Sequence, residues 1–167
     1  ARADTLPITR IDWRPAPAGD ERTDPATGTW VVLHNGGTGG LGERAARQLR
    51  ADGARVVEVG VGPAGTPAHG PDHRTLTRPD EETFRRLWEE IGDPVAGVLH
   101  LWNADAAPDD AQAPGEETEL RLGLYGCLAA LRTLGERQRK SRFHVVTRDG
   151  QPVGTGDRPV PARAALW

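Results

Sequence analysis

The chain has 167 residues, with 24 acidic and 21 basic side chains and a formal net charge of −3. This length allows one domain with a core of its own. The nearly balanced charge gives no electrostatic reason to expect a nucleic acid or an anionic membrane as a partner. No run approaches about 18 consecutive apolar residues, and the first residues are polar, so we expect no membrane span, no signal peptide and a cytoplasmic location.

The first predicted strand covers residues 8–14, where alternating apolar side chains indicate an edge strand. After a polar loop, residues 29–34 form a continuous and largely β-branched run, as in a strand that is covered on both faces. Apolar residues at helical spacing then predict a helix over residues 40–52, which Gly53 ends. Residues 55–59 follow as the second central strand.

Residues 60–79 are rich in Gly, Pro and His and are predicted to form a loop. Within it, His69 and His73 have the spacing of two metal ligands on one helix face, but the Pro and Gly residues around them favour a solvated loop. Asp80 is predicted to cap the next helix, because its side chain can accept hydrogen bonds from the first turn. The apolar stripe of that helix is Phe84, Leu87, Trp88 and Ile91.

Two more central strands are predicted over residues 95–102 and 142–147, with the longest helix between them within residues 116–140. We expect this helix to bury one apolar face, made of Leu120, Leu124, Cys127, Leu128, Leu131 and Leu134. Strands that alternate with helices pair in parallel, with right-handed crossovers. The predicted fold class is therefore α/β. Residues 1–28 would form an N-terminal edge strand and loop, and residues 29–167 a truncated Rossmann-like parallel sheet with helices on both faces.

A glycine-rich turn joins the first central strand to the first predicted helix. Gly36, Gly40 and Gly42 stand at the positions of a dinucleotide-binding fingerprint, in which glycines allow a tight turn and the helix amides receive a diphosphate. Glu58 lies near the place where a ribose-binding acid is expected, although it alternates with valines and could point from mid-strand instead. The turn is therefore either a retained nucleotide site or a vestigial one that is kept for strand–helix packing.

A short-chain reductase needs a Tyr that donates a proton, a Lys one helical turn later that lowers its pKa, and a Ser that polarises the carbonyl. The only tyrosine is Tyr125, and the residue four positions later is Ala129. The only lysine, Lys140, lies 15 residues after the tyrosine, and the only serine, Ser141, lies in a basic turn. No serine nucleophile accompanies the histidines on or beside the strands, His34, His100 and His144. We predict no catalytic residues and no metal site. Cys127, the single cysteine, is expected to be a small buried hydrophobe.

Seven segments carry a further pattern: residues 11–15 (Ile-Asp-Trp-Arg-Pro), 30–42, 52–57, 84–87, 95–102, 145–148 and 161–167 (Pro-Ala-Arg-Ala-Ala-Leu-Trp). Together they make nearly the whole chain resemble the N-terminal structural subdomain of the ketoreductase domains of modular type I polyketide synthases. In that family, the ketoreductase consists of two halves that both resemble short-chain reductases, and only the second half is catalytic. One departure is Asn35, where a Thr is expected, in a turn that is closer to the cofactor loop of the catalytic half.

The resemblance implies that this chain binds no cofactor itself and packs against the catalytic subdomain. That subdomain would bind NADPH and reduce a β-ketoacyl thioester on the acyl carrier protein. Other synthase domains would be further partners, in a multienzyme of antibiotic biosynthesis that combines transferase and oxidoreductase activities. Three alternatives stay open: a nucleotide-binding Rossmann module, the scaffold half of a degenerate ketoreductase, and a reductase that works as one complete domain.

Overall fold

The computed structural model describes residues 26–35, 39–63, 70–92, 94–105, 115–138, 140–154 and 156–167, so the predicted strand over residues 8–14 lies outside it. Within these ranges, one parallel sheet contains five strands: β1 (Thr29–Leu33), β2 (Arg55–Val61), β3 (His73–Leu76), β4 (Val95–His100) and β5 (Arg142–Val145). The strand order is β3-β2-β1-β4-β5, so the direction of the crossovers reverses between β1 and β4. The predicted α/β class and parallel sheet are confirmed.

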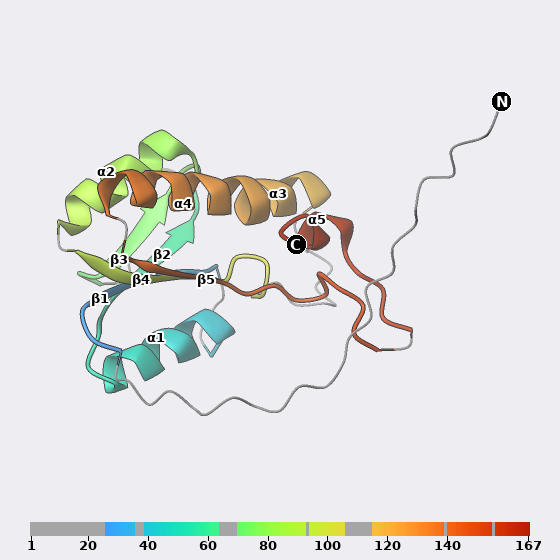
Figure 1. Ribbon diagram of the computed structural model, residues 1–167, viewed down its shortest axis with the longest axis horizontal. Coiled ribbons are helices and arrows are strands. Elements are labelled where there is room, and N and C mark those ends of the chain that lie inside the picture. Colours follow the sequence, from blue (N-terminus) through green and yellow to red (C-terminus); the bar gives the residue numbers. More distant parts are fainter. Residues whose placement is uncertain are drawn as a thin grey trace.

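Helices cover both faces of the sheet (Figure 1). One face carries α1 (Leu41–Ala51), and the opposite face carries α2 (Glu81–Ile91), α3 (Glu116–Leu120) and α4 (Gly126–Arg137). A π-helical segment, Arg121–Tyr125, connects α3 to α4 without a break, and α5 (Pro161–Ala164) packs beside α3. In the part of the chain that the structure describes, no helix has the length and apolar character needed to cross a membrane.

The sheet separates two hydrophobic cores. The larger core lies under α2 and α4 and contains the α2 stripe of Phe84, Leu87, Trp88 and Ile91 together with side chains of β1, β2 and β4. The smaller core lies under α1 and includes Trp30, Val32, Ala46, Val56 and Leu101. Every residue of β1 is buried, as expected for a strand that is covered on both faces.

Local signals predicted most of the elements correctly. The α2 helix begins after Asp80, whose side chain accepts a hydrogen bond from the Thr83 amide at 2.9 Å, as predicted for the cap. The strand β3 is a correction, because residues 60–79 were predicted to form a loop. This strand has four residues, pairs only with β2, and buries only Leu76 fully. It has no apolar periodicity, and its backbone becomes a strand because β2 offers hydrogen bonds to it.

The face that the longest helix buries is a second correction. Leu128 and Leu131 were predicted to face the core, yet each is 46% exposed. Cys127 and Leu134 of the predicted face are buried as expected, and the rest of the buried face consists of small residues. Small residues are needed because the amide of Asn103 and the ring of Trp102 approach the helix backbone closely. A Cβ on Gly123 would lie 1.9 Å from Nδ2 of Asn103, and a Cβ on Gly126 would lie 2.8 Å from the ring of Trp102. The buried face of α4 is Gly126, Cys127, Ala129, Ala130, Thr133 and Leu134.

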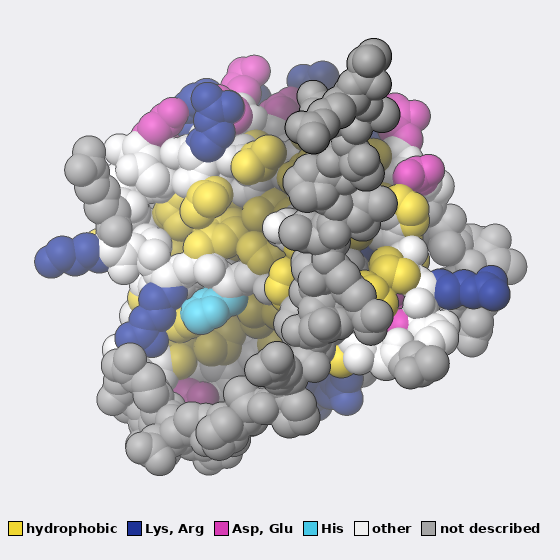
Figure 2. Space-filling model, turned by 45° about the vertical axis from the view of Figure 1, so that its right-hand side comes forward, with side chains coloured by type: hydrophobic (Ala, Val, Ile, Leu, Met, Phe, Trp, Pro, Cys, Tyr) yellow, Lys and Arg dark blue, Asp and Glu magenta, His cyan; other side chains and the backbone are white. Residues whose placement is uncertain are grey.

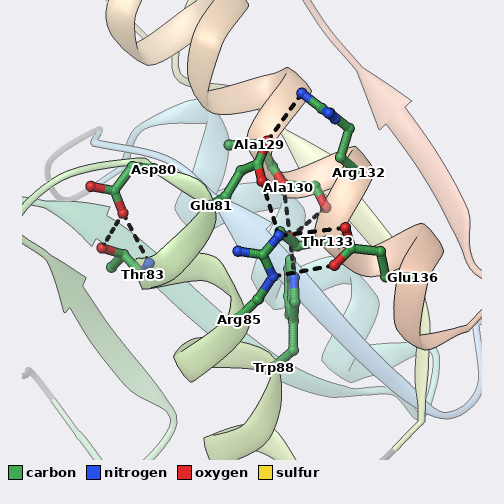
Figure 3. A network of polar contacts seen from close by, with 10 residues as sticks. All are labelled: Asp80, Glu81, Thr83, Arg85, Trp88, Ala129, Ala130, Arg132, Thr133 and Glu136. Atoms are coloured by element: carbon green, nitrogen blue, oxygen red, sulfur yellow. Dashed lines mark hydrogen bonds and ion pairs between the residues drawn. The ribbon is translucent and has the colours of Figure 1, made fainter.

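Polar contacts join α2 to α4 (Figure 3). The indole Nε1 of Trp88 donates to the hydroxyl of Thr133 at 2.8 Å, and this hydroxyl donates to the carbonyl of Ala129 at 2.7 Å. Nearer the surface, Nε of Arg85 lies 3.2 Å from a carboxylate oxygen of Glu136. Because the indole and the hydroxyl are buried, their hydrogen bonds remove a desolvation cost and fix the two helices relative to each other.

A buried ion pair fixes the C-terminal helix. The side chain of Arg163 is 5% exposed, and its Nη2 and Nε lie 2.7 and 3.3 Å from the two carboxylate oxygens of Glu119. Its Nη1 lies 3.3 Å from the carboxylate of Asp149. The indole Nε1 of Trp167 donates to the hydroxyl of Thr147 at 3.1 Å. These contacts hold the last residues against α3 and against the segment that follows β5.

Candidate functional site

The candidate site lies at the carboxyl edge of the sheet, where β1 and β4 are neighbours and their crossovers run in opposite directions. Open parallel sheets bind ligands at this point. His34 and Asn35 follow β1, and residues 101–105 follow β4. Of the three fingerprint glycines, Gly36 lies outside the described residues, Gly40 is the residue before α1, and Gly42 lies in the first turn of α1.

Gly42 allows α1 to begin directly against His34. A Cβ at this position would lie 2.2 Å from Cγ of the His34 ring, so no side chain fits without movement of the strand end or of the helix. The imidazole is buried, with 5% of the residue exposed. The glycine therefore has a packing role that is independent of any bound nucleotide.

Carboxylates of the chain itself hold two amides at the start of α1. The amide of Gly42 donates to Oδ1 of Asp105 at 3.2 Å, and the amide of Gly39 donates to the carboxylate of Glu43. In a dinucleotide site, the amides at such a helix start receive the diphosphate, because they carry unpaired N–H groups and the positive end of the helix dipole. Here Asp105 and Glu43 occupy that position.

Glu58 belongs to a partly buried polar network, in which the Arg50 side chain is 44% exposed. It lies within β2, level with Val32 of β1, and its two carboxylate oxygens lie 3.0 Å from Nε2 of His34 and 2.7 Å from Nη2 of Arg50. Burial acts to raise the pKa of Glu58, but the hydrogen bonds and charges of Arg50 and His34 together hold it below its usual value. On its other side, His34 Nδ1 lies 3.8 Å from Oδ2 of Asp105. Glu58 thus points from mid-strand and bonds to protein groups.

These residues do not fit the diphosphate of NADPH, the cofactor that the resemblance assigns to a catalytic half. Asp105 and Glu43 hold the amides that a diphosphate would need, and Glu58 adds a third carboxylate nearby. Bringing phosphate charges against these groups would cost electrostatic energy, and an acid at the Glu58 position also disfavours a 2′-phosphate.

A hollow of about 440 Å³ lies at the same edge of the sheet, beside the ends of β1, β2 and β3. Its described lining consists of Asn35, Val61, Gly62, Pro63, Thr77, Thr118, Arg121 and Leu122. The side-chain oxygen of Asn35 accepts a hydrogen bond from the Val61 amide at 2.8 Å and so shapes one wall. Arg121 is the charged residue in this lining. The sequence did not single it out, because it comes from a helix that only the folded chain brings beside the strand ends.

The residues considered for catalysis do not come together. Tyr125 is 60% exposed on the π-helical segment. The longest helix was predicted within residues 116–140, but α4 ends at Arg137, so Lys140 lies beyond this helix. The hydroxyl of Ser141 donates to the carbonyl of Val95 at 2.7 Å. The three side chains therefore have separate structural positions and form no proton-donating group for a carbonyl.

The remaining titratable candidates have separate positions in the fold. Burial raises the pKa of the Cys127 thiol to about 11, as expected for a small buried hydrophobe. His144 stacks on Trp30 with ring centroids 5.9 Å apart, and His73 lies in β3 with its ring 6.3 Å from that of His34. His69 lies outside the described residues. Among those described, no group of three or more His, Cys, Asp or Glu side chains could hold a metal ion.

Comparisons with known proteins place the fold. No family model matches the chain, and no curated protein matches it. Among solved structures, a keto acid-selecting nonribosomal peptide synthetase module with adenylation, ketoreductase and pseudo-Asub domains aligns with a TM-score of 0.74 and 15% identity, over 93% of this chain and 13% of that one. A short-chain dehydrogenase from Burkholderia cenocepacia J2315 in complex with NADP aligns with a TM-score of 0.59 and 17% identity, over 86% of this chain and 64% of that one.

Aldohexose dehydrogenase from Thermoplasma acidophilum aligns with a TM-score of 0.55 and 15% identity, over 84% of this chain and 58% of that one. The chain thus spans less than two thirds of each of these three proteins. At these identities the likeness shows the fold alone. The chain has the Rossmann-like fold of short-chain dehydrogenases over the part of their length that it spans.

Proposed function

We propose that this chain is the structural, non-catalytic half of a ketoreductase in a cytoplasmic polyketide synthase. It would support a catalytic half that reduces a β-ketoacyl thioester on the acyl carrier protein with NADPH. The observation that carries the proposal is a short-chain reductase fold in which Asp105 and Glu43 hold the amides that a diphosphate would need. The separate positions of Tyr125, Lys140 and Ser141 support it, and so does the alignment with a ketoreductase-containing module.

The second apolar face of α4 supports a protein partner. Leu128 and Leu131 are each 46% exposed, and Tyr125 is 60% exposed, while the opposite side of the helix packs on the core. A helix that is apolar on two sides has one side for its own core and one for another surface. Figure 2 shows hydrophobic side chains gathered on this side of the molecule, with charged side chains at the rim above them.

The edge of β5 is a second surface that could receive a partner. In the described part of the sheet, β5 is the last strand, and it pairs with β4 only. Val145 and Val146 are 41% and 38% exposed. An unpaired edge with exposed valines is stabilised when another segment covers it. We assign this cover to the catalytic half, together with the leucine face, Leu128 and Leu131.

The test is to express the catalytic half with this chain and without it, and to measure its thermal stability and ketone-dependent NADPH oxidation. We expect the catalytic half to lose both when this chain is absent. Equal stability and turnover without the chain would contradict the proposal. Activity of the 167-residue chain alone would instead support a reductase that works as one domain.

Variants of the leucine face locate the contact. Leu128→Glu and Leu131→Glu place a charge in the expected interface, and we expect each to weaken association of the two halves by about tenfold or more, measured by isothermal titration calorimetry. Arg86→Glu is the matched control, because it also adds a carboxylate to an exposed helix position, but on α2, where the Arg86 side chain is 73% exposed and pairs with Glu82. Unchanged association in both leucine variants would exclude this face.

The hollow beside Asn35 and Arg121 is the observation that favours a nucleotide-binding module as the second candidate. That function predicts measurable binding of NAD(H) or NADP(H) by the chain alone, lost on Gly40→Val, which places a side chain at the start of α1. The structural role predicts no measurable binding in either protein. Calorimetry of both proteins with both cofactors separates the two functions.

A further inference from the structure

We propose that the hollow beside the ends of β1, β2 and β3 binds a small organic acid with one carboxylate and a compact apolar body. Arg121 holds the carboxylate of this ligand, and the apolar wall of the hollow contacts its body. The inference concerns this chain alone and does not rest on the proposed pairing with a catalytic half.

The hollow has the size and lining of a small-molecule site. Its described lining comes from the ends of three strands and from the helix that begins with α3, so the folded chain alone creates it. Its volume of about 440 Å³ lies within the range of about 300 to 1,000 Å³ that is usual for such sites. Val61, Pro63 and Leu122 provide an apolar wall. An apolar wall with a few polar groups favours a ligand that has an apolar body.

Arg121 is the single charged residue of the described lining, and it is exposed to solvent. Glu117 stands four residues earlier, at the spacing of a helical ion pair, yet no ion pair joins Arg121 to a carboxylate of the described residues. Glu119 lies on the same helix, but its buried carboxylate bonds to Arg163 at 2.7 Å. The guanidinium of Arg121 is therefore available to bind a carboxylate through two parallel hydrogen bonds.

The other polar groups of the lining also suit an anion. Asn35 uses its side-chain oxygen to accept the Val61 amide at 2.8 Å, which leaves its NH2 group as a donor. The hydroxyls of Thr77 and Thr118 can each donate one hydrogen bond. The described lining contains no carboxylate that would repel a negative charge. These groups together match a ligand with acceptor oxygens.

The number of charges selects a monoanion. One guanidinium matches one negative charge, whereas a dinucleotide brings several, and Asp105 and Glu43 already hold the α1 amides that would receive its diphosphate. The backbone position of Arg121 is fixed by Leu122, which is 7% exposed and belongs to the larger core. Arg121 is also the first residue of the π-helical segment, and such segments within helices occur frequently at functional sites.

The test titrates the native chain and Arg121→Gln with benzoate, phenylacetate and isovalerate at constant ionic strength, followed by heteronuclear NMR spectroscopy of the backbone amides. We expect at least one of these acids to shift the amide signals of Val61 and Gly62 in a saturable manner. Its dissociation constant should rise by about tenfold or more in Arg121→Gln, because the charge-assisted hydrogen bonds are lost. Saturable binding of none of the three acids, or equal affinity in Arg121→Gln, would overturn the inference.

Three controls complete the experiment. Benzamide has the shape of benzoate without its charge, so it should bind about tenfold more weakly or not at all. Arg132→Gln removes the same charge from the same helix, where Nη1 of Arg132 lies 3.1 Å from Glu81 of α2, and it should bind the acids like the native chain. Thr77→Trp fills the hollow from an exposed position, and it should abolish binding without lowering the melting temperature.

The controls also define the outcomes that contradict the proposal. Benzamide binding as tight as that of benzoate would show a hollow without a carboxylate site. An equal loss of affinity in Arg132→Gln would show a general charge effect, and undiminished binding in Thr77→Trp would place the acid elsewhere. Displacement of the acid by NADH or NADPH would overturn the selection of a monoanion and would support the nucleotide-binding module instead.

Discussion

Acid should destabilise this chain through His100. The imidazole is completely buried at the end of β4, with its ring edge-on to Trp102 at a centroid distance of 5.1 Å. Neither ring nitrogen has a hydrogen-bond partner of standard geometry within the described residues. Burial lowers the pKa of His100 from 6.5 to about 4, and the backbone groups of Leu122 and of His100 itself act in the opposite direction.

The direction of the pH effect follows from the protonation of His100 in the unfolded and in the folded chain. In the unfolded chain the imidazole titrates near its ordinary pKa, so below pH 6.5 the unfolded state binds a proton that the folded state does not accept until about pH 4. The free energy of unfolding therefore falls as the pH falls through this range. Linkage gives a loss of about 2 kcal/mol between pH 7 and pH 5, and about 3 kcal/mol at pH 4.

The assay is urea denaturation at pH 7 and pH 5, followed by circular dichroism. His100→Phe removes the titrating group and keeps a ring, so the difference in unfolding free energy between the two pH values should shrink by about 2 kcal/mol. His144→Gln is the control, because His144 is exposed on β5, and it should keep the native difference. If His100→Phe retains the full pH dependence, the reasoning is refuted.

Three more predictions concern stability, each measured as the free energy of unfolding in urea. Gly42→Ala should cost about 1 to 3 kcal/mol, because the added methyl group collides with the ring of His34. An unchanged urea midpoint would contradict this packing role of Gly42. Thr133→Val should cost about 1 to 3 kcal/mol by leaving the buried indole N–H of Trp88 without an acceptor, whereas Thr133→Ser should stay near native stability. Arg163→Met should cost about 3 to 5 kcal/mol, because it leaves the Glu119 carboxylate buried without its partner. A second change, Glu119→Leu, should restore most of that loss. Native stability of the single variant Arg163→Met would show that the ion pair does not stabilise the fold.

The elements that the sequence predicted correctly are those with local causes. Residues 29–34 are buried on both faces, and their unbroken apolar run shows it. Asp80 caps α2 through contacts within one turn, so the residue type and its position suffice. The strand β3 has no such cause. Its four residues become a strand because β2 lies beside them, and that pairing is decided by the whole fold.

The residues of the candidate site also divide into those with a local sequence signal and those without one. Gly42 was found through its spacing, because a tight strand–helix turn leaves a local pattern. Asp105 was not found, because an acid in a predicted loop looks like any solvated acid until β4 places it against α1. Leu128 and Leu131 were wrongly assigned to the buried face of α4, whereas Cys127 and Leu134 were assigned to it correctly. A helix backbone that approaches Asn103 and Trp102 closely selects small residues, and a single sequence does not show which neighbours a helix will meet.

The two glycines in the long helix also determine its rotational setting. Only a face without Cβ atoms fits against Asn103 and Trp102, so the helix cannot turn about its axis to bury Leu128 and Leu131 without pushing Asn103 or the Trp102 ring aside. The leucine face is therefore a constant feature of the molecule and not one of several helix orientations. Any surface that evolved to fit it could rely on a rigid template, and a substitution at either glycine would alter that template from the opposite side of the helix.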